Sequence, residues 1–285
     1  MTPLPRADTH LHLSQWWPEL ARTGYRPDLD YTVQGLLREM TANGIDFGLA
    51  IQIVETPDAR SGLAESRSIL KESGGRLRPV VTVDPTKGSA TIDSTLGLWE
   101  MEPGIAGIKL FPGYRPFYPH DRRLAPVYEF ARKRALPVLV HQGDTLHKDG
   151  LLKFARPIEL DEVAVQYPDV RFVLCHFGNP WIDEAAELVY KNENIYVDTS
   201  GLLAHPSAPF FPRMVEQCRE RLLSAILTVG SSDRILYGSD WPLQELSQSV
   251  QLIDRLDLPA EDRAKILGGN ARRLFGATAR TGPGA

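Results

Sequence analysis

The sequence predicts a (β/α)8 barrel. Short runs of β-branched residues alternate with amphipathic stretches almost to the end of the 285-residue chain, with no linker between them. The apolar runs are dense in Val, Ile and Leu rather than strictly alternating, which is typical of parallel strands covered by helices. We count eight strands, each followed by helix-compatible sequence, and this favours a closed barrel. An open doubly wound sheet is the alternative, but no Gly-x-Gly-x-x-Gly follows the first strand.

Each element is placed by its pattern of apolar residues. The first strand is the short N-terminal stretch before a His-x-His pair. Residues 31–43 follow with apolar side chains at helical spacing, and Gly44 is their C-terminal cap. The later strands are predicted at residues 47–54, 79–83, 105–111, 137–141, 171–176, 194–199 and 234–240. Helices are predicted at 31–43, 60–73, 92–101 and 122–134, between the later strands, and finally at 260–275.

Composition limits the classes of function. The formal net charge of -4 and the pI near 6.0, without a dense basic cluster, argue against a nucleic-acid binder or an anionic membrane surface. We expect a cytoplasmic protein, because no apolar run can span a bilayer and the N-terminus lacks the apolar core of a signal peptide. Residues 1–277 are expected to form one domain, and the small, polar tail at 278–285 is expected to be flexible.

The candidate functional residues lie where the predicted strands end. His10 and His12 follow the first strand, and side chains two residues apart on a strand share a face, so both can bind one metal ion. His141, His176 and Asp240 end the fifth, sixth and eighth strands. In a barrel the carboxyl ends of all strands meet at one mouth. Imidazole and carboxylate groups suit zinc, and also iron, manganese or nickel.

Each of these residues alone has a simpler interpretation. His141 and His176 are compatible with buried core histidines, and Asp240 with a cap on the following helix. It is their combination that favours a metal site. The remaining histidines lie in polar or Pro-rich loops and are interpreted as solvated side chains rather than ligands: His120, His147 and His205.

Several motifs in this order resemble the amidohydrolase superfamily, and within it the amidohydrolase-related branch of metal-dependent decarboxylases and lactone hydrolases. They are Asp8-Thr9-His10-Leu11-His12, Gly107-Ile108-Lys109-Leu110-Phe111-Pro112, Val138-Leu139-Val140-His141, Val173-Leu174-Cys175-His176, Tyr237-Gly238-Ser239-Asp240-Trp241-Pro242 and the closing Gly269-Asn270-Ala271-Arg272-Arg273-Leu274-Phe275-Gly276.

The resemblance implies a role for each strand-end residue. It makes His10, His12, His141 and Asp240 the ligands of one divalent metal ion, with zinc as the first expectation. His176 then contacts the water bound to the metal, or the substrate. A bound divalent ion lowers the pKa of its water from about 15.7 to about 7. Asp240 is the expected acceptor of that proton, and His176 would orient the water or stabilise negative charge.

Lys109 and Arg115 are the predicted substrate-binding residues. Some members of the superfamily carry a carboxylated lysine at the position of Lys109, which would bring a second metal ion bound by His141 and His176. We favour one ion, with Lys109 pairing with an acid or with a substrate carboxylate. The planar fork of Arg115 suits a carboxylate, and a solvated loop arginine is the alternative. Phe111 stands where many relatives carry a polar residue.

The expected function is hydrolysis of an ester, lactone or amide bond in a small organic substrate. Non-oxidative decarboxylation of a small carboxylic acid is the second reading, and a non-catalytic barrel with a structural metal is the third. In this interpretation residues 205–212 form either a lid or an oligomer contact, and the second alternative would make the protein a homo-oligomer. Aromatic residues near the expected mouth are candidates for an apolar pocket: Trp16, Trp17, Tyr114, Phe117, Tyr118, Trp181 and Trp241.

Overall fold

The structure is a computed structural model that describes residues 5–15, 29–53, 55–102, 104–203 and 207–276. Its eight strands run parallel and pair in chain order around a barrel. Thr9 in the first strand donates a backbone hydrogen bond of 2.9 Å to Tyr237, just beyond the last strand, and a bridge joins Leu11 to Trp241. The two edges of the sheet therefore meet, and the predicted (β/α)8 barrel is confirmed.

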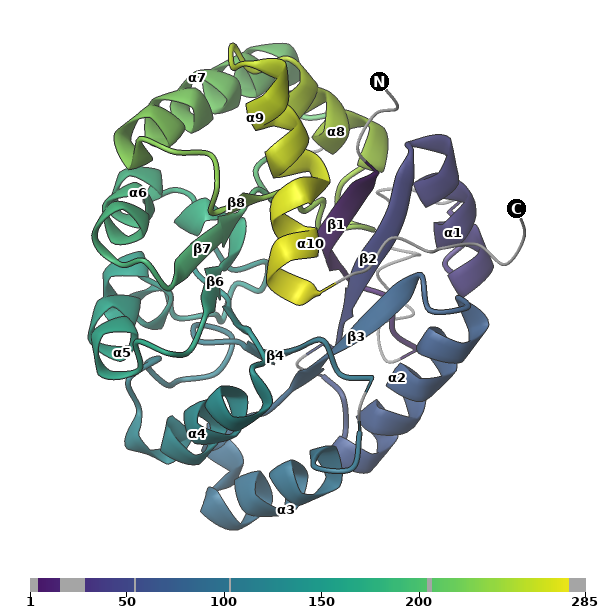
Figure 1. The fold of residues 1–285 in the computed structure, drawn as a ribbon, viewed down its shortest axis with the longest axis vertical. Coiled ribbons are helices and arrows are strands. Elements are labelled where there is room, and N and C mark those ends of the chain that lie inside the picture. The colour runs from purple at the N-terminus through teal and green to yellow at the C-terminus, as the bar shows by residue number, and fades with distance from the viewer. Residues whose placement is uncertain (1–4, 16–28, 54, 103, 204–206, 277–285) are drawn as a thin grey trace.

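Helices surround the strands on the outside of the barrel (Figure 1). The strands are β1 (Arg6–Leu11), β2 (Ile45–Ile51), β3 (Leu77–Thr82), β4 (Gly107–Leu110), β5 (Val138–Val140), β6 (Phe172–Leu174), β7 (Ile195–Asp198) and β8 (Ile235–Leu236). The helices are α1 (Val33–Ala42), α2 (Ala59–Glu72), α3 (Ser89–Trp99), α4 (Ala125–Arg134), α5 (Asp161–Gln166), α6 (Ile182–Lys191), α7 (Phe211–Val229), α8 (Leu246–Asp254), α9 (Ala260–Ala264) and α10 (Asn270–Phe275).

Local capping determines where several helices begin and end. The Thr32 side chain accepts a hydrogen bond from the Gly35 amide at the start of α1, and the Asp58 carboxylate caps the start of α2. Gly230 ends α7 with a φ of 73°, a conformation that glycine adopts without the steric cost of a Cβ atom. The predicted helix at 122–134 begins as a 3-10 turn, so α4 starts only at Ala125.

The last strands are shorter than predicted. Residues 171–176 and 234–240 were each expected to be one strand, but only the cores β6 and β8 join the ladder. The chain leaves the sheet in turns in which His176 and Asp240 have φ values of 59° and 68°. The predicted final helix at 260–275 is divided into α9, a π-helical turn η6 (Lys265–Gly269) and α10.

The helix α10 covers the end of the barrel at which the strands begin. One buried apolar cluster joins Phe47, Leu49 and Ile51 of β2 to Leu274 and Phe275 of α10. The start of β3 is tied to the same helix, since Arg78 donates a hydrogen bond of 2.6 Å to the Phe275 carbonyl oxygen. The carboxyl ends of the strands thus form the opposite, polar end of the barrel.

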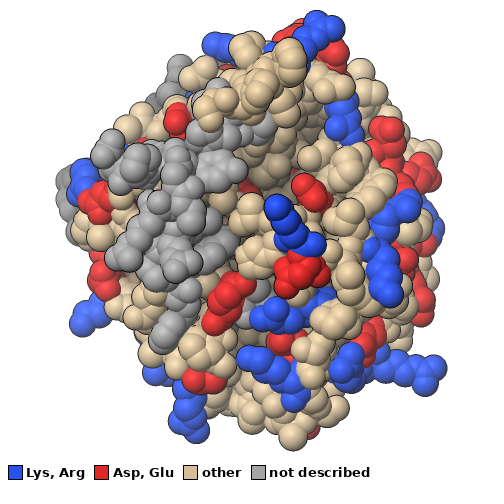
Figure 2. Space-filling model, turned by 180° about the vertical axis from the view of Figure 1, so that it is seen from behind, with Lys and Arg blue, Asp and Glu red and all other residues tan. Residues whose placement is uncertain are grey.

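Figure 2 shows the molecule from the side opposite α10. Acidic and basic side chains are interspersed on this face, with no broad area of one sign among the described residues. Within the ranges that the structure describes, no helix is both long and apolar enough to cross a membrane. The predicted flexible tail at 278–285 lies outside the described residues.

Candidate metal centre and active site

Three predicted ligands converge at the mouth of the barrel. His10 Nε2 and His12 Nε2 lie 3.5 Å and 3.4 Å from Asp240 Oδ1, and all three side chains are buried. In the described part of the chain, no hydrogen-bond partner reaches His10 Nε2. A buried nitrogen without a hydrogen-bond partner raises the free energy of the folded protein, whereas a bound metal ion would accept its lone pair. Two imidazoles and one carboxylate therefore fit a divalent cation.

Asp198, at the end of β7, orients the first of these ligands. Its Oδ2 lies 2.8 Å from His10 Nδ1, and both side chains are fully buried. Burial opposes ionisation of Asp198, but the neighbouring His10 ring outweighs it and keeps the pKa of Asp198 well below its usual range. An ionised carboxylate only accepts, so His10 carries its proton on Nδ1 and directs a bare Nε2 at the cluster.

The sequence analysis missed Asp198, although it is the last residue but one of the predicted strand at 194–199 and the last residue of β7. The signal that could have identified it, an acidic residue near the carboxyl end of a predicted strand, was therefore present in the sequence. An aspartate at a strand end is common in loops and caps, and only its distance to His10 distinguishes it.

His141 and His176 lie against each other beside this cluster. His176 Nε2 is 3.1 Å from His141 Nδ1, and His141 Nε2 donates to the Asp144 carbonyl oxygen at 3.0 Å. Burial lowers the pKa of His141 and of His176, and it lowers the pKa of His10 to about 3. The three rings are therefore neutral near pH 7, as metal ligands and proton acceptors must be.

The backbone at the mouth is held in uncommon conformations. His176 has a φ of 59°, and its amide donates to Asp198 Oδ1 at 2.9 Å. Asp240 has a φ of 68°, and its amide donates to the His10 carbonyl oxygen at 2.9 Å. Left-handed conformations of residues other than glycine persist where surrounding contacts impose them. The helix α8 begins at Leu246 and has no capping side chain in the described part of the chain, so Asp240 does not serve as the helix cap considered from the sequence.

A chamber of about 270 Å³ opens above the histidines and joins a hollow of about 40 Å³. The two spaces share Tyr114, His141, His176, Asp240 and Leu243. The chamber also contacts Asp144, Leu146, Asn179, Gly201, Leu203 and Gln244. The hollow also contacts His12, Ile53, Glu55, Lys109, Phe111 and His147. The volume suits a substrate of about one ring.

Lys109 lines the hollow and is fully buried. Its Nζ lies 2.9 Å from Cys175 Sγ and 5.1 Å from the centre of the Phe111 ring. No carboxylate of the described residues forms an ion pair with Nζ. A buried ammonium group without a counter-ion is costly, so this position suits an anionic ligand.

Arg115 points away from the chamber. Its Nε donates to Asp84 Oδ2 at 3.2 Å, and it lines neither the chamber nor the hollow. His147, interpreted as a solvated loop residue, does line the hollow, with its ring centre 5.4 Å from that of Tyr114. His120 lies elsewhere, with its Nε2 3.2 Å from Glu159 Oε2.

Of the predicted pocket aromatics in the described residues, only Tyr114 lines the chamber. Phe117 and Trp241 are core residues, Tyr118 stacks on His120 at 5.0 Å, and Trp181 lies 5.0 Å from the Arg156 guanidinium. Trp16, Trp17 and His205 lie outside the described residues, as does part of the predicted lid at 205–212.

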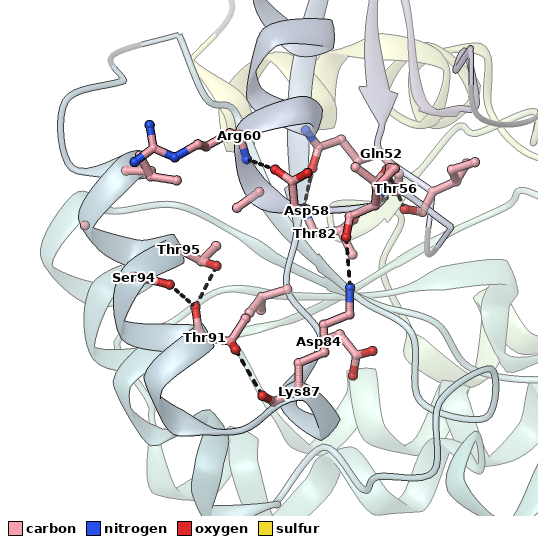
Figure 3. A pocket seen from close by; sticks show the side chains of 16 residues that line it. Gln52, Thr56, Asp58, Arg60, Thr82, Asp84, Lys87, Thr91, Ser94 and Thr95 are labelled. Atoms are coloured by element: carbon pink, nitrogen blue, oxygen red, sulfur yellow. Dashed lines mark hydrogen bonds between the residues drawn. The ribbon is translucent and has the colours of Figure 1, made fainter.

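A separate groove of about 550 Å³ lies between α2 and α3 (Figure 3). Several of its polar groups are already hydrogen-bonded: Asp58 caps α2, Lys87 Nζ donates to the Pro57 carbonyl oxygen at 3.4 Å, and the Thr95 hydroxyl donates to the Thr91 carbonyl oxygen at 2.7 Å. Among the described residues, none that lines it is a histidine or cysteine. The metal-binding chemistry therefore belongs to the histidine chamber.

A family model described as Amidohydrolase matches residues 7–277. The chain belongs to the amidohydrolase family. Gamma-resorcylate decarboxylase of Rhizobium radiobacter is 33% identical to this amidohydrolase over 58% of the chain and 54% of the relative. L-fucono-1,5-lactonase of Burkholderia ambifaria is 25% identical over 95% of each chain. The amidohydrolase thus spans about half the length of the decarboxylases that it matches.

Solved structures share the barrel of this amidohydrolase. An amidohydrolase from Burkholderia multivorans with bound zinc has a TM-score of 0.73 at 16% identity, covering 96% of this chain and 99% of that one. A dihydroxybenzoic acid decarboxylase from Polaromonas, with bound manganese and the inhibitor 2-nitroresorcinol, has a TM-score of 0.69 at 18% identity, covering 95% and 96%. At these identities the likeness establishes the fold.

Proposed function

We propose that this amidohydrolase is a metal-dependent decarboxylase of a small, hydroxylated aromatic carboxylic acid. The observation that carries the proposal is the buried Lys109 ammonium, which lines the hollow beside the histidines without a carboxylate partner among the described residues. A substrate carboxylate would supply its missing counter-charge. The similarity to resorcylate decarboxylases supports this reading over the hydrolysis expected first from the sequence.

In the proposal, His10, His12, His141 and Asp240 hold one divalent ion, with zinc or manganese as the candidates. When bound, the ion would polarise a substrate oxygen as a Lewis acid. The rings of Phe111 and Tyr114, whose centres lie 6.0 Å apart, would form apolar walls around the substrate ring. Asp144, Asn179 and Gln244, on the outer wall of the chamber, would bind its hydroxyl groups.

His176 and Lys109 would carry out the chemistry together. Lys109 holds the carboxylate, and the bond between that carbon and the ring breaks as carbon dioxide leaves. The electron pair stays on the ring carbon, which takes a proton that His176 Nε2 has first accepted from solvent. Arg115 has no role in this scheme, because its side chain is paired with Asp84 outside the chamber.

Lactone hydrolysis is the second candidate, because the lactonase relative matches 95% of both chains. In that case His176 or Asp240 would accept a proton from the attacking water. The two functions use the same side chains but give different products.

Substrate screening distinguishes the two candidates. Purified protein is first analysed for metal content, then tested with a set of hydroxybenzoic acids and a set of sugar lactones, each with and without chelator. We expect one ion per chain and chelator-sensitive release of carbon dioxide without a hydrolysed product. Hydrolysis of lactones alone would favour the second candidate, and chelator-insensitive activity with no bound metal would contradict both.

A further inference from the structure

Ser200 lies between two histidines of the site. It lies two residues after the end of β7 and is fully buried. Its Oγ lies 2.9 Å from His176 Nδ1 and 3.0 Å from His10 Nδ1, and its hydroxyl donates a short hydrogen bond to Asp198 Oδ1. One hydroxyl group thus contacts a proposed metal ligand, the proposed proton donor and the carboxylate that orients the ligand.

The positions of the protons follow from counting donors. Asp198 Oδ1 accepts hydrogen bonds from the backbone amides of His176 at 2.9 Å and Ser200 at 3.1 Å, so it is an acceptor, and the single hydroxyl proton of Ser200 is directed at it. Ser200 Oγ then has only lone pairs for the rings that face it. His10 Nδ1 already donates to Asp198 Oδ2 at 2.8 Å. The remaining acceptor site of Ser200 is therefore filled by a proton on His176 Nδ1.

A neutral imidazole has one ring proton, so a proton on Nδ1 leaves Nε2 bare. His176 Nε2 is the nitrogen that lies 3.1 Å from His141 Nδ1. His141 carries its own proton on Nε2, which donates to the Asp144 carbonyl oxygen. Two bare nitrogens thus face each other beside the metal cluster, and both are available to a cation or a proton.

We propose that Ser200 is a positioning residue that fixes His176 in the tautomer protonated on Nδ1, so that Nε2 is the atom that accepts and delivers the reacting proton. The tautomer follows from the contacts alone, and its catalytic consequence rests on the proposed function. Without the Ser200 acceptor, the proton could move to Nε2, where it would donate to His141 Nδ1 and compete with metal binding or proton transfer.

Gly201 supports the same arrangement from the next position. Its φ is 64°, and a Cβ atom built there would lie 2.7 Å from His176 Nδ1 and 3.3 Å from Asp240 Oδ2. The chain therefore passes directly against the His176 ring. Residues 198–201 contact His176 at its amide through Asp198, at Nδ1 through Ser200 and at the ring through Gly201.

Nitrogen NMR of the zinc-loaded protein with labelled histidine tests the tautomer directly. In the parent protein, His176 should carry its proton on Nδ1, and His176→Ala assigns the signal. In Ser200→Ala we expect the proton to move wholly or partly to Nε2. We also expect kcat to fall about 100-fold, at the lower end of proton-transfer effects, with KM unchanged. The adjacent Thr199→Val should change neither the His176 tautomer nor kcat, because within the described residues the Thr199 hydroxyl accepts one hydrogen bond of 3.4 Å, from the Gly238 amide.

A His176 signal that stays protonated on Nδ1 in Ser200→Ala would overturn the proposal. If that variant does not fold, Ser200→Gly gives a second test, because it also removes the hydroxyl group that faces His176 Nδ1. An unchanged tautomer in Ser200→Gly would also contradict the proposal. Because NMR reads the ring itself, the absence of decarboxylase activity would count against the proposed function only.

Discussion

The Lys109 ammonium group has a thiol and an aromatic ring as neighbours inside the barrel. Lys109→Met keeps most of the stem but removes the charge that would hold a carboxylate. Because a hydrogen bond to a charged group contributes about 1.5–3 kcal/mol, we expect KM for a carboxylic acid substrate to rise about 10- to 100-fold. Steady-state kinetics measures this. Lys133→Met removes an exposed lysine paired with Glu100 and should leave KM unchanged.

His176 is the proposed proton donor rather than a metal ligand. In His176→Ala we expect kcat to fall roughly 10²- to 10⁴-fold, because proton transfer to the substrate is lost. Metal content and the circular dichroism spectrum should stay as in the parent protein. The matched control is His120→Ala, which removes a histidine that contacts Glu159 away from the chamber. Unchanged turnover in His176→Ala would count against the proton-transfer role. Loss of metal from this variant would indicate that His176 is a metal ligand.

At the scale of elements, Asn270 fixes the last strand to the last helix. It is buried at the start of α10, and its Nδ2 donates to the carbonyl oxygens of Ser232 and Ile235, both at 2.7 Å. Asn270→Ala leaves both carbonyl groups without this donor, so we expect the free energy of unfolding to fall by about 2–3 kcal/mol. Denaturant titration measures this change. Gln34→Ala, which removes an exposed amide on α1, should have little effect.

The positions of the strands could be predicted because runs of apolar residues indicate segments that are buried in the protein. Each predicted strand contains or overlaps an observed one, since parallel strands inside a ring of helices must be apolar on both faces. The strand ends could be predicted too, which is why His10, His12 and Asp240 were found together. The turns could not be predicted, because the φ values of His176 and Asp240 are set by contacts with Asp198 and the β1 backbone, far away in sequence.

Side-chain directions in the loops were the least predictable part of the site. Arg115 pairs with Asp84, 31 residues away, and so points away from the chamber. His147 packs against Tyr114 from another loop and so points toward it. No local pattern encodes either contact, because loop periodicity does not report burial. The same holds for Ser200, whose neighbours come from β1, from β7 and from the turn after β6.

At the scale of the whole molecule, the barrel separates an apolar end from a polar end. The helix α10 covers the amino ends of the strands, and histidines and carboxylates gather at the carboxyl ends. We propose that residues 1–277 form one domain around this axis, while a homo-oligomer and a cytoplasmic location stay predictions from the sequence. Gathering several ionisable groups in the buried polar end makes the stability of the molecule depend on pH.

Burial sets the direction of that dependence. It lowers the pKa of His10 to about 3 and also lowers the pKa values of His141 and His176, whereas each histidine titrates near 6.5 in the unfolded chain. Below about pH 6.5 the unfolded state therefore binds protons that the folded state does not. Their contribution to stability is complete above this pH and is lost as the pH falls. Asp8 acts in the opposite sense, because burial raises its pKa from 3.8 to about 7.

The Asp8 contribution is complete at low pH and is lost as the pH rises toward 7, so it offsets about one of the three histidines. The metal-free protein should therefore become less stable when the pH is lowered from 7.5 to 5. Each net unit of pKa difference between the folded and unfolded states within this pH range lowers the free energy of unfolding by about 1.4 kcal/mol. Denaturant titration of chelator-treated protein at several pH values measures this slope. His120→Gln, which changes a histidine outside the chamber, should keep the slope, whereas stability that rises on acidification would show that Asp8 outweighs the buried histidines.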